Sequence, residues 1–429
     1  MACEITGDTL RFRRALEALR SGVPNRDAVA VLGCNQPEVE QEFSRLLSRI
    51  AESTSVTESG LGILVAGDFG TGKSHLLEYL ENQALAANFV CSRVVISKET
   101  PLFNLEKVYK AAIDNGKVPW VTGQMIEEIA QKLDPRSDEY ARFFSWANSE
   151  DNGLSRIFPA TLMVHERSSD LELLNEITWF WSGERIRLAR VRDGLRSISQ
   201  SHVYSFKGQP TRQLAPQRLR FALELIKGAG YRGWVVMMDE IELVAKYSLF
   251  QRARSYAELA RWMGQVPDEA YPGLLVVGTV ARDFAAKVLV EKEDRDKAAP
   301  RLRARQTDEY NIAAARAESG MRMIERDVRV LSEPDDTTLK TVYERLKDIY
   351  SQGYEWATPD INHGIARGGR RIMRSYVRRW INEWDLRRLY HDAQPEIEET
   401  EVSSDYKEDT TFEKEGGDAD NAQHEDASR

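Results

Sequence analysis

Apolar residues along the chain occur in two patterns, short continuous runs and helical spacings. Four continuous runs rich in Val, Leu and Ile predict buried strands, at residues 61–66, 88–97, 234–238 and 273–280. Between these runs, apolar residues recur every three or four positions, which predicts amphipathic helices. Strands that alternate with helices are typical of an α/β fold. We therefore expect a parallel central sheet flanked by helices.

The predicted helices are distributed unevenly around the strands. They divide the chain into an N-terminal helical segment (1–55), a core (56–330) with a large helical insertion (about 105–225), and a C-terminal helical region (331–392). The first helix should end at Gly22 and Pro24 because these residues break helices. The turn that contains them is a candidate cover for a bound adenine ring. A simple packing role for this turn is the alternative.

Charge is concentrated at the C-terminal end. The chain carries a net charge of −9, and residues 393–429 contain 13 Asp and Glu against 3 Lys and Arg, so the rest of the chain is close to neutral. A segment so acidic and so poor in apolar residues predicts a disordered tail. Two roles stay open for this tail: solubility alone, or regulation by competition with nucleic acid for basic surfaces.

Composition also indicates the compartment. The three cysteines, Cys3, Cys34 and Cys91, lack the spacing of metal ligands and suit a reducing environment. No apolar run approaches the about 18 residues that a membrane span needs, and the N-terminus lacks the apolar region of a signal peptide. We therefore expect a cytoplasmic protein that makes no membrane contact.

The segment after the first predicted strand is rich in glycine. Its sequence, GDFGTGKS, satisfies the P-loop pattern G-x-x-x-x-G-K-[ST]. Glycines let backbone N–H groups turn toward an anion, and the start of the following helix adds positive potential. Lys73 should reach the β- and γ-phosphates of ATP, and Ser74 should place its hydroxyl on Mg²⁺. The predicted nucleotide-binding residues here are Gly67, Asp68, Phe69, Gly70, Thr71, Gly72, Lys73, Ser74 and His75. The alternative is a glycine-rich turn that only caps the helix.

Two acidic residues follow the third predicted strand, as in a Walker B motif. Asp239 should hold Mg²⁺, and Glu240 should polarise the water that attacks the γ-phosphorus. Thr279, near the end of the fourth strand, is a candidate hydrogen-bond partner of the γ-phosphate or of that water. The alternatives are a solvated acidic pair and a threonine chosen for strand propensity.

Two later segments are rich in arginine. Arg301, Arg303 and Arg305 follow Pro300, and such arginines can reach into the active site of a neighbouring subunit. A surface of solvated ion pairs is the alternative for this segment.

The second arginine-rich segment, residues 367–388, contains eight arginines interleaved with aromatic residues. Arg371, at a predicted helix start, is a candidate contact to the nucleotide. Arg374, Arg378 and Arg379 are candidate contacts to the phosphate backbone of DNA. Docking of this helix on acidic parts of the same chain is the alternative.

Several of these segments together resemble one known family. The stretches are ALRSGVPNRDAV, GDFGTGKSHLLEYL, VVISKETPLFNLEKVY, VVMMDEIELV and GGRRIMRSYV. They are similar to the P-loop ATP-binding proteins of bacteriophage-exclusion (BREX) systems, over about residues 15–384. The resemblance implies an AAA-like P-loop NTPase with a helical or winged-helix C-terminal domain. It places Thr279 at the first sensor position and Arg371 at the second, and it matches Arg305 loosely to an arginine finger.

Residues and resemblance together predict an ATPase. It should couple the binding and hydrolysis of Mg-ATP to work on DNA or partner proteins in an antiphage defence system. It should act as a homo-oligomer or with other proteins of that system. Two alternatives stay open: a nucleotide-controlled assembly switch with little turnover, and an ATP-dependent DNA-binding regulator.

Overall fold

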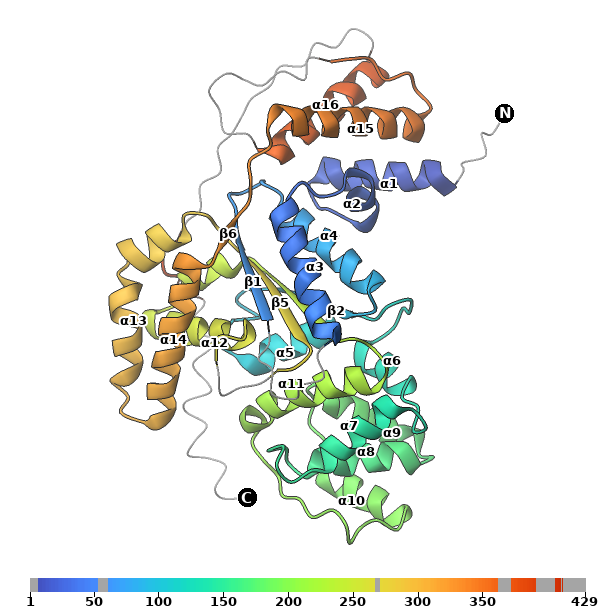
Figure 1. The fold of residues 1–429 in the computed structure, drawn as a ribbon, viewed down its shortest axis with the longest axis vertical. Helices are drawn as coiled ribbons and strands as arrows, with labels where there is room; N and C mark the ends of the chain where they lie inside the picture. The colour runs from blue at the N-terminus through green and yellow to red at the C-terminus, as the bar shows by residue number, and fades with distance from the viewer. Residues whose placement is uncertain are drawn as a thin grey trace.

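A six-stranded sheet lies at the centre of the protein (Figure 1). The structure is a computed structural model that describes residues 7–52, 61–266, 271–361, 372–390, 406–409 and 411. In chain order the strands are β1 (Leu61–Ala66), β2 (Val90–Val95), β3 (Gly116–Lys117), β4 (Trp234–Asp239), β5 (Leu274–Val280) and β6 (Arg329–Val330). Their spatial order is β3-β2-β4-β5-β1-β6, and every neighbouring pair is parallel except β2 and β3.

The expected α/β fold is therefore confirmed, with a mixed, mostly parallel sheet. All four predicted strands form, and each observed end lies within two residues of the predicted one. The sequence did not reveal β3 and β6, because each has two residues and is too short for a periodic pattern. The antiparallel β3 lies at one edge of the sheet, outside β2.

Helices cover both faces of the sheet, which explains why its strands are continuously apolar. On one face, Ile63 and Val65 of β1 pack with α3 (Pro37–Glu52) and α4 (Lys73–Ala86). On the other face, Leu64 and Ala66 belong to a larger core with the helices of residues 105–326. Alternate residues of one strand thus enter two different clusters, as the period of a β-strand requires.

About half of the larger core comes from residues 105–225, the range predicted as a helical insertion. It holds α5 (Leu105–Asp114), α6 (Met125–Gln131), α7 (Asp138–Asn148), α8 (Ile157–Arg167), α9 (Leu171–Trp181), α10 (Leu188–Ser197) and α11 (Thr211–Gly228). After β4 come the 3₁₀-helix η1 (Ile241–Lys246) and α12 (Leu249–Trp262), and after β5 come the π-helix η2 (Ala285–Glu291), α13 (Asp294–Arg303) and α14 (Asp308–Arg326). Figure 1 shows α12, α13 and α14 grouped beside the sheet and α6 to α11 extending beyond it.

The two ends of the described chain share a separate small core. Helices α1 (Gly7–Ser21) and α2 (Arg26–Leu32) pack with α15 (Asp336–Tyr354) and α16 (Met373–Leu389), above the sheet in Figure 1. Trp380 and Trp384 of α16 are buried in it, so these aromatic rings are core residues. The sequence predicts these N-terminal and C-terminal helices in two different segments. Among the described residues of this region no strand pair occurs that would form a wing.

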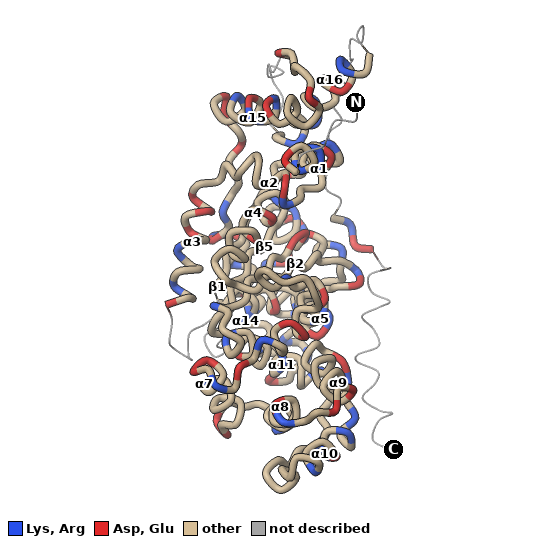
Figure 2. Tube along the Cα trace, turned by 90° about the vertical axis from the view of Figure 1, so that its right-hand side faces the viewer, with Lys and Arg blue, Asp and Glu red and all other residues tan. Residues whose placement is uncertain are grey.

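Acidic and basic residues are interspersed along the described chain (Figure 2). None of the described helices combines the length and the apolar character that crossing a membrane requires.

Candidate functional site

The glycine-rich loop joins β1 to α4, so the predicted order of strand, loop and helix is confirmed. Gly70 and Gly72 have backbone φ values of +80° and +105°, which residues other than glycine rarely adopt. A Cβ atom on Gly67 would lie 2.5 Å from the Thr71 hydroxyl oxygen. The loop backbone therefore favours glycine over other residues at these three positions. Helix α4 begins at Lys73, directly after the loop.

The Lys73 side chain folds back over the loop. Its Nζ donates to the carbonyl of Gly67 at 2.7 Å and lies 3.6 Å from Oε1 of Glu242 in η1. Burial raises the pKa of Glu242, and Lys73 partly offsets that rise. The sequence did not single out Glu242, although its position two residues after Glu240 was a possible signal.

Asp239 connects the P-loop to the middle of the sheet. Its Oδ2 accepts a hydrogen bond of 3.0 Å from the Ser74 hydroxyl, and its Oδ1 accepts one of 2.6 Å from the Thr279 hydroxyl. Burial raises the pKa of Asp239, but the hydrogen bonds from Thr279 and Arg93 outweigh this effect, and the net pKa is below the ordinary value. Thr279 is fully buried and contacts the carboxylate, so in this structure it orients Asp239.

Arg93 is a site residue that sequence reasoning missed. It lies in β2, opposite Met237 of β4 in the sheet register, and its guanidinium lies 2.9 Å from Asp239 and 3.5 Å from Glu78 of α4. An arginine in the middle of an otherwise apolar strand needs a partner, because burying an unpaired charge is costly. That lone charge in the run VCSRVV was the available signal.

Glu240 stands at the carboxyl end of β4 and is exposed. Its backbone is left-handed, with φ of 61°, and its N–H donates to its neighbour Asp239. Partial burial of the carboxyl and the nearby charge of Asp239 both raise the pKa of Glu240. The predicted residues Lys73, Ser74, Asp239, Glu240 and Thr279 thus lie around the mouth of the P-loop.

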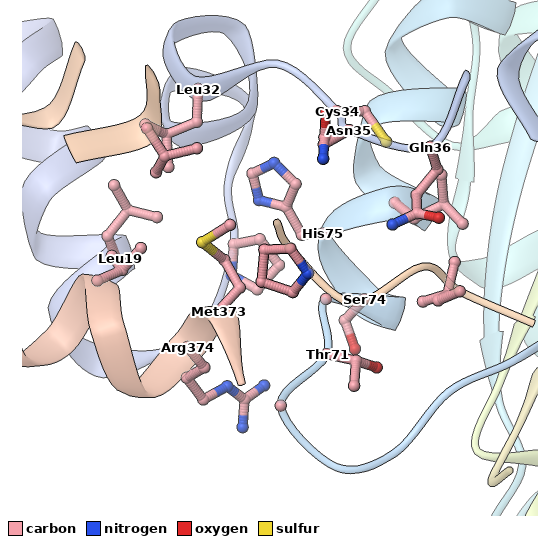
Figure 3. A pocket seen from close by; sticks show the side chains of 18 of the residues that line it. Leu19, Leu32, Cys34, Asn35, Gln36, Thr71, Ser74, His75, Met373 and Arg374 are labelled. Carbon is pink, nitrogen blue, oxygen red and sulfur yellow. The ribbon is translucent and has the colours of Figure 1, made fainter. Parts of the chain in front are cut away.

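A cavity of about 140 Å³ opens beside the P-loop. Its walls come from the turn after α1, the segment between α2 and α3, the start of α4 and the start of α16 (Figure 3). Gly22 and Pro24 line it together with Gly70 to Gly72, so the turn predicted as a cover borders the same cavity as the loop. An apolar cavity of roughly 150 Å³ can hold a benzene ring, so this one has room for a flat ring of about that size.

His75 lies at the centre of this cavity in Figure 3. Its Nε2 is 2.8 Å from the carbonyl of Gly33, and burial lowers the pKa of its ring, so the neutral imidazole donates there. Next to Gly33 in the same wall, burial and Glu40 raise the pKa of Cys34 to about 12, which leaves an unreactive thiol. His75 therefore joins the P-loop helix to the cavity wall.

A family model described as BREX system ATP-binding protein BrxC/D matches residues 9–125 and 205–376, well over half of the chain. The chain belongs to the BrxC/D family. The resemblance seen in the sequence is thereby confirmed, and the protein is an ATP-binding protein of a BREX antiphage system. Residues 126–204, which hold most of α6 and all of α7 to α10, lie outside the match. No curated protein and no solved structure gives a significant match.

In this BrxC/D-family protein the C-terminal arginine at the P-loop is Arg374. Its backbone N–H donates to the carbonyl of Gly70 at 3.3 Å, and its guanidinium lies 4.9 Å from the ring centroid of Phe69. Burial and the charge of Arg378 lower the pKa of Arg374. Arg374 is thus half-buried against the P-loop, one helical turn before the exposed Arg378. Its contact with DNA stays a prediction. Arg371 lies outside the described residues.

The other arginines of α16 have different environments. Arg387 pairs with Glu383 at 2.6 Å, and Arg388 donates to the Tyr350 hydroxyl at 3.1 Å. For these two, docking within the chain is the observed state. Arg378 is exposed, and Nε of Arg379 is buried without a hydrogen-bond partner among the described residues.

The structure does not bring Arg305 to the P-loop of its own chain. Its guanidinium lies 5.0 Å from the ring centroid of Phe250, and the nearby Arg303 pairs with Glu318 at 2.7 Å. The role of Arg305 as an arginine finger stays a prediction.

Proposed function

We propose that this BREX-family protein binds ATP with Mg²⁺ at the P-loop and hydrolyses it. One observation carries the proposal: Ser74 and Asp239, 165 positions apart in the chain, place side-chain oxygens 3.0 Å apart. P-loop ATPases hold Mg²⁺ with a hydroxyl and a carboxylate of this kind. Mg²⁺ keeps several waters and takes phosphate oxygens, so a site with few protein ligands fits it. Bound Mg²⁺ would neutralise charge on the phosphate oxygens.

The chain's own residues have separable parts in this chemistry. Lys73 would exchange Glu242 and the Gly67 carbonyl for the β- and γ-phosphates, while backbone N–H groups of the loop hold the same oxygens. Glu240 would accept the proton of the attacking water, and its raised pKa favours that role at neutral pH. Arg93 and Thr279 would keep Asp239 ionised and oriented.

The cavity beside the loop would receive the adenine ring. It is lined by apolar side chains of α1, α2 and α16 and by Gly70, Thr71 and Gly72 of the P-loop. A base held there would contact both the N-terminal and the C-terminal helices. Nucleotide binding would therefore fix the small terminal core against the sheet.

We place the protein among AAA-like ATPases of the additional-strand type. The position of β5 between β1 and β4 supports this, as does the arginine that the C-terminal helices bring to the loop. Arg374 would sense the nucleotide from this side, with Arg371 as a second candidate. Arg305 would act as a finger in a neighbouring copy, which implies a homo-oligomer or an assembly with other defence-system proteins.

Phosphate release from ATP tests the proposed reaction. We expect steady-state turnover in Mg²⁺ and disappearance of nearly all of it in excess chelator, with recovery when Mg²⁺ is restored. Tight ATP binding with no turnover in either condition would favour the nucleotide-controlled assembly switch instead.

Work on DNA is a second candidate function, and the exposed Arg378 favours it. We expect that changing Arg378 and Arg379 to Gln weakens binding to duplex DNA irrespective of sequence. The slope of log affinity against log salt should become shallower by about 0.9 for each phosphate that the variant no longer neutralises. Fluorescence anisotropy across a salt series measures both quantities.

Arg387→Gln is the matched control, since that guanidinium pairs with Glu383. If the double variant keeps the parent's affinity and slope, α16 is not a DNA surface. Partner proteins would then be the better candidates for the substrate of the ATPase.

A further inference from the structure

A short part of the acidic tail lies against the core. The hydroxyl of Tyr406 donates to Asp283 at 2.5 Å, and its ring meets the ring of Phe284 edge to face with centroids 6.2 Å apart. Tyr406 thereby joins the larger hydrophobic core. Composition alone predicted a disordered tail, and it contained no signal for this contact.

The next contact joins Glu408 to a buried arginine. Oε1 of Glu408 lies 2.5 Å from Nη1 of Arg252, whose side chain is 4% exposed. The other donors of Arg252 bond to the fully buried Asp294 at 2.7 and 2.8 Å, and Tyr256 donates to the same carboxylate. Nη1 also donates to the carbonyl of Tyr247 at 2.6 Å. The receiving group is thus held rigidly by the core, independently of the tail.

The third contact reaches the segment that follows the Walker B residues. The N–H of Asp409 donates to the carbonyl of Lys246, the last residue of η1, at 3.0 Å. Hydrogen bonds from Thr411, with smaller contributions from the charges of Lys246 and Lys98, lower the pKa of Asp409. Because η1 begins directly after Glu240, the tail is bonded to the element that carries Glu242 and follows Glu240 in the chain.

We propose that Tyr406-Lys407-Glu408-Asp409 is a docking motif of the acidic tail. Its receiving surface is formed by Phe284 and Asp283, the guanidinium of Arg252 and the end of η1. The occupant is this chain's own tail, because the Tyr406 hydroxyl and ring meet Asp283 and Phe284, and the Glu408 carboxylate meets the buried Arg252. The Asp409 N–H adds a bond to the Lys246 carbonyl. The docked motif holds η1 in the conformation that presents Glu240 and Glu242 to the P-loop.

The motif can act through weak contacts because it is tethered. An ion pair with one half-exposed partner contributes little by itself, and Glu408 is 52% exposed. A covalent tether raises the effective concentration of the motif to roughly the millimolar range, which suffices for a weak site. The full chain is therefore the right material for a test.

Hydrogen–deuterium exchange on the full chain tests the docking. Tyr406→Ala combined with Glu408→Gln should speed amide exchange in residues 241–252 by about fivefold, the factor that a decrease of about 1 kcal/mol in local stability gives. Arg252 is left unchanged, because its replacement would leave the buried Asp294 without a cation and destabilise the fold.

Glu398→Gln combined with Glu399→Gln serves as the control, because it removes acidic charge from the same tail outside the motif. This control should exchange like the parent. Unchanged exchange in the motif variant, or an equal change in the control, would overturn the proposal.

A second readout depends on the proposed ATPase function. The motif variant should have turnover lower by about threefold with unchanged ATP affinity, because a looser η1 misplaces Glu240 rather than the phosphate-binding loop. If the parent has no turnover, the proposed function fails while the exchange result still decides the docking. Faster exchange with unchanged turnover would leave the docking in place and overturn its effect on the placement of Glu240.

Discussion

Replacing Lys73 with Ala should weaken Mg-ATP binding by about 10²-fold or more, because the replacement removes a charge-assisted interaction with phosphate. In this structure Lys73 bonds to the Gly67 carbonyl and lies near Glu242. The effect of the replacement on folding stability should be smaller than its effect on ATP binding. Isothermal titration with Mg-ATP measures the decrease in affinity.

The stability of the same variant should depend on pH. Burial already raises the pKa of Glu242, and removing Lys73 takes away the charge that lowers it. A carboxyl group whose folded pKa is raised costs stability as pH rises through that pKa. The melting temperature of Lys73→Ala should therefore fall further below the parent at about pH 7.5 than at about pH 5.

Lys340→Ala, at an exposed position of α15, is the control for removing a lysine. It should bind Mg-ATP like the parent, and its melting temperature should differ from the parent's by the same amount at both pH values. A Lys73→Ala protein that also binds like the parent would mean that the glycine-rich loop is not the phosphate site.

Glu240→Gln should retain ATP binding and reduce turnover by about 10²-fold or more, because the amide cannot accept a proton. The replacement keeps the size of the side chain at a position with φ of 61°. Single-turnover phosphate release, together with a binding titration on the same sample, separates chemistry from affinity.

Glu242→Gln is the matched comparison, since both acidic residues lie in the same short segment. Its carboxylate faces Lys73, so we expect its effect on ATP affinity to exceed its effect on turnover. If Glu242→Gln reduces turnover by about 10²-fold and Glu240→Gln does not, Glu242 is the base.

The sequence by itself determined the local elements of this protein. The strands around Val65, Val236 and Val277 are continuous apolar runs because both of their faces are covered, and such runs are visible without a structure. The P-loop is visible because positive φ values at Gly70 and Gly72 restrict these positions to glycine, at a fixed spacing in the chain. Family membership followed from these local segments.

Tertiary structure decided which charges meet. The guanidinium of Arg93 reaches Asp239 only because β2 pairs with β4, and Arg374 reaches the P-loop because α16 packs with α1 beside it. Their sequence surroundings, an apolar strand and an arginine-rich helix, did not indicate either partner. Residues 406–409 are a further case, since composition described the tail but not the surface that receives Tyr406. Periodicity in a sequence reports that a side chain is buried or exposed, whereas its partner is fixed by contacts between distant segments that only the folded chain brings together.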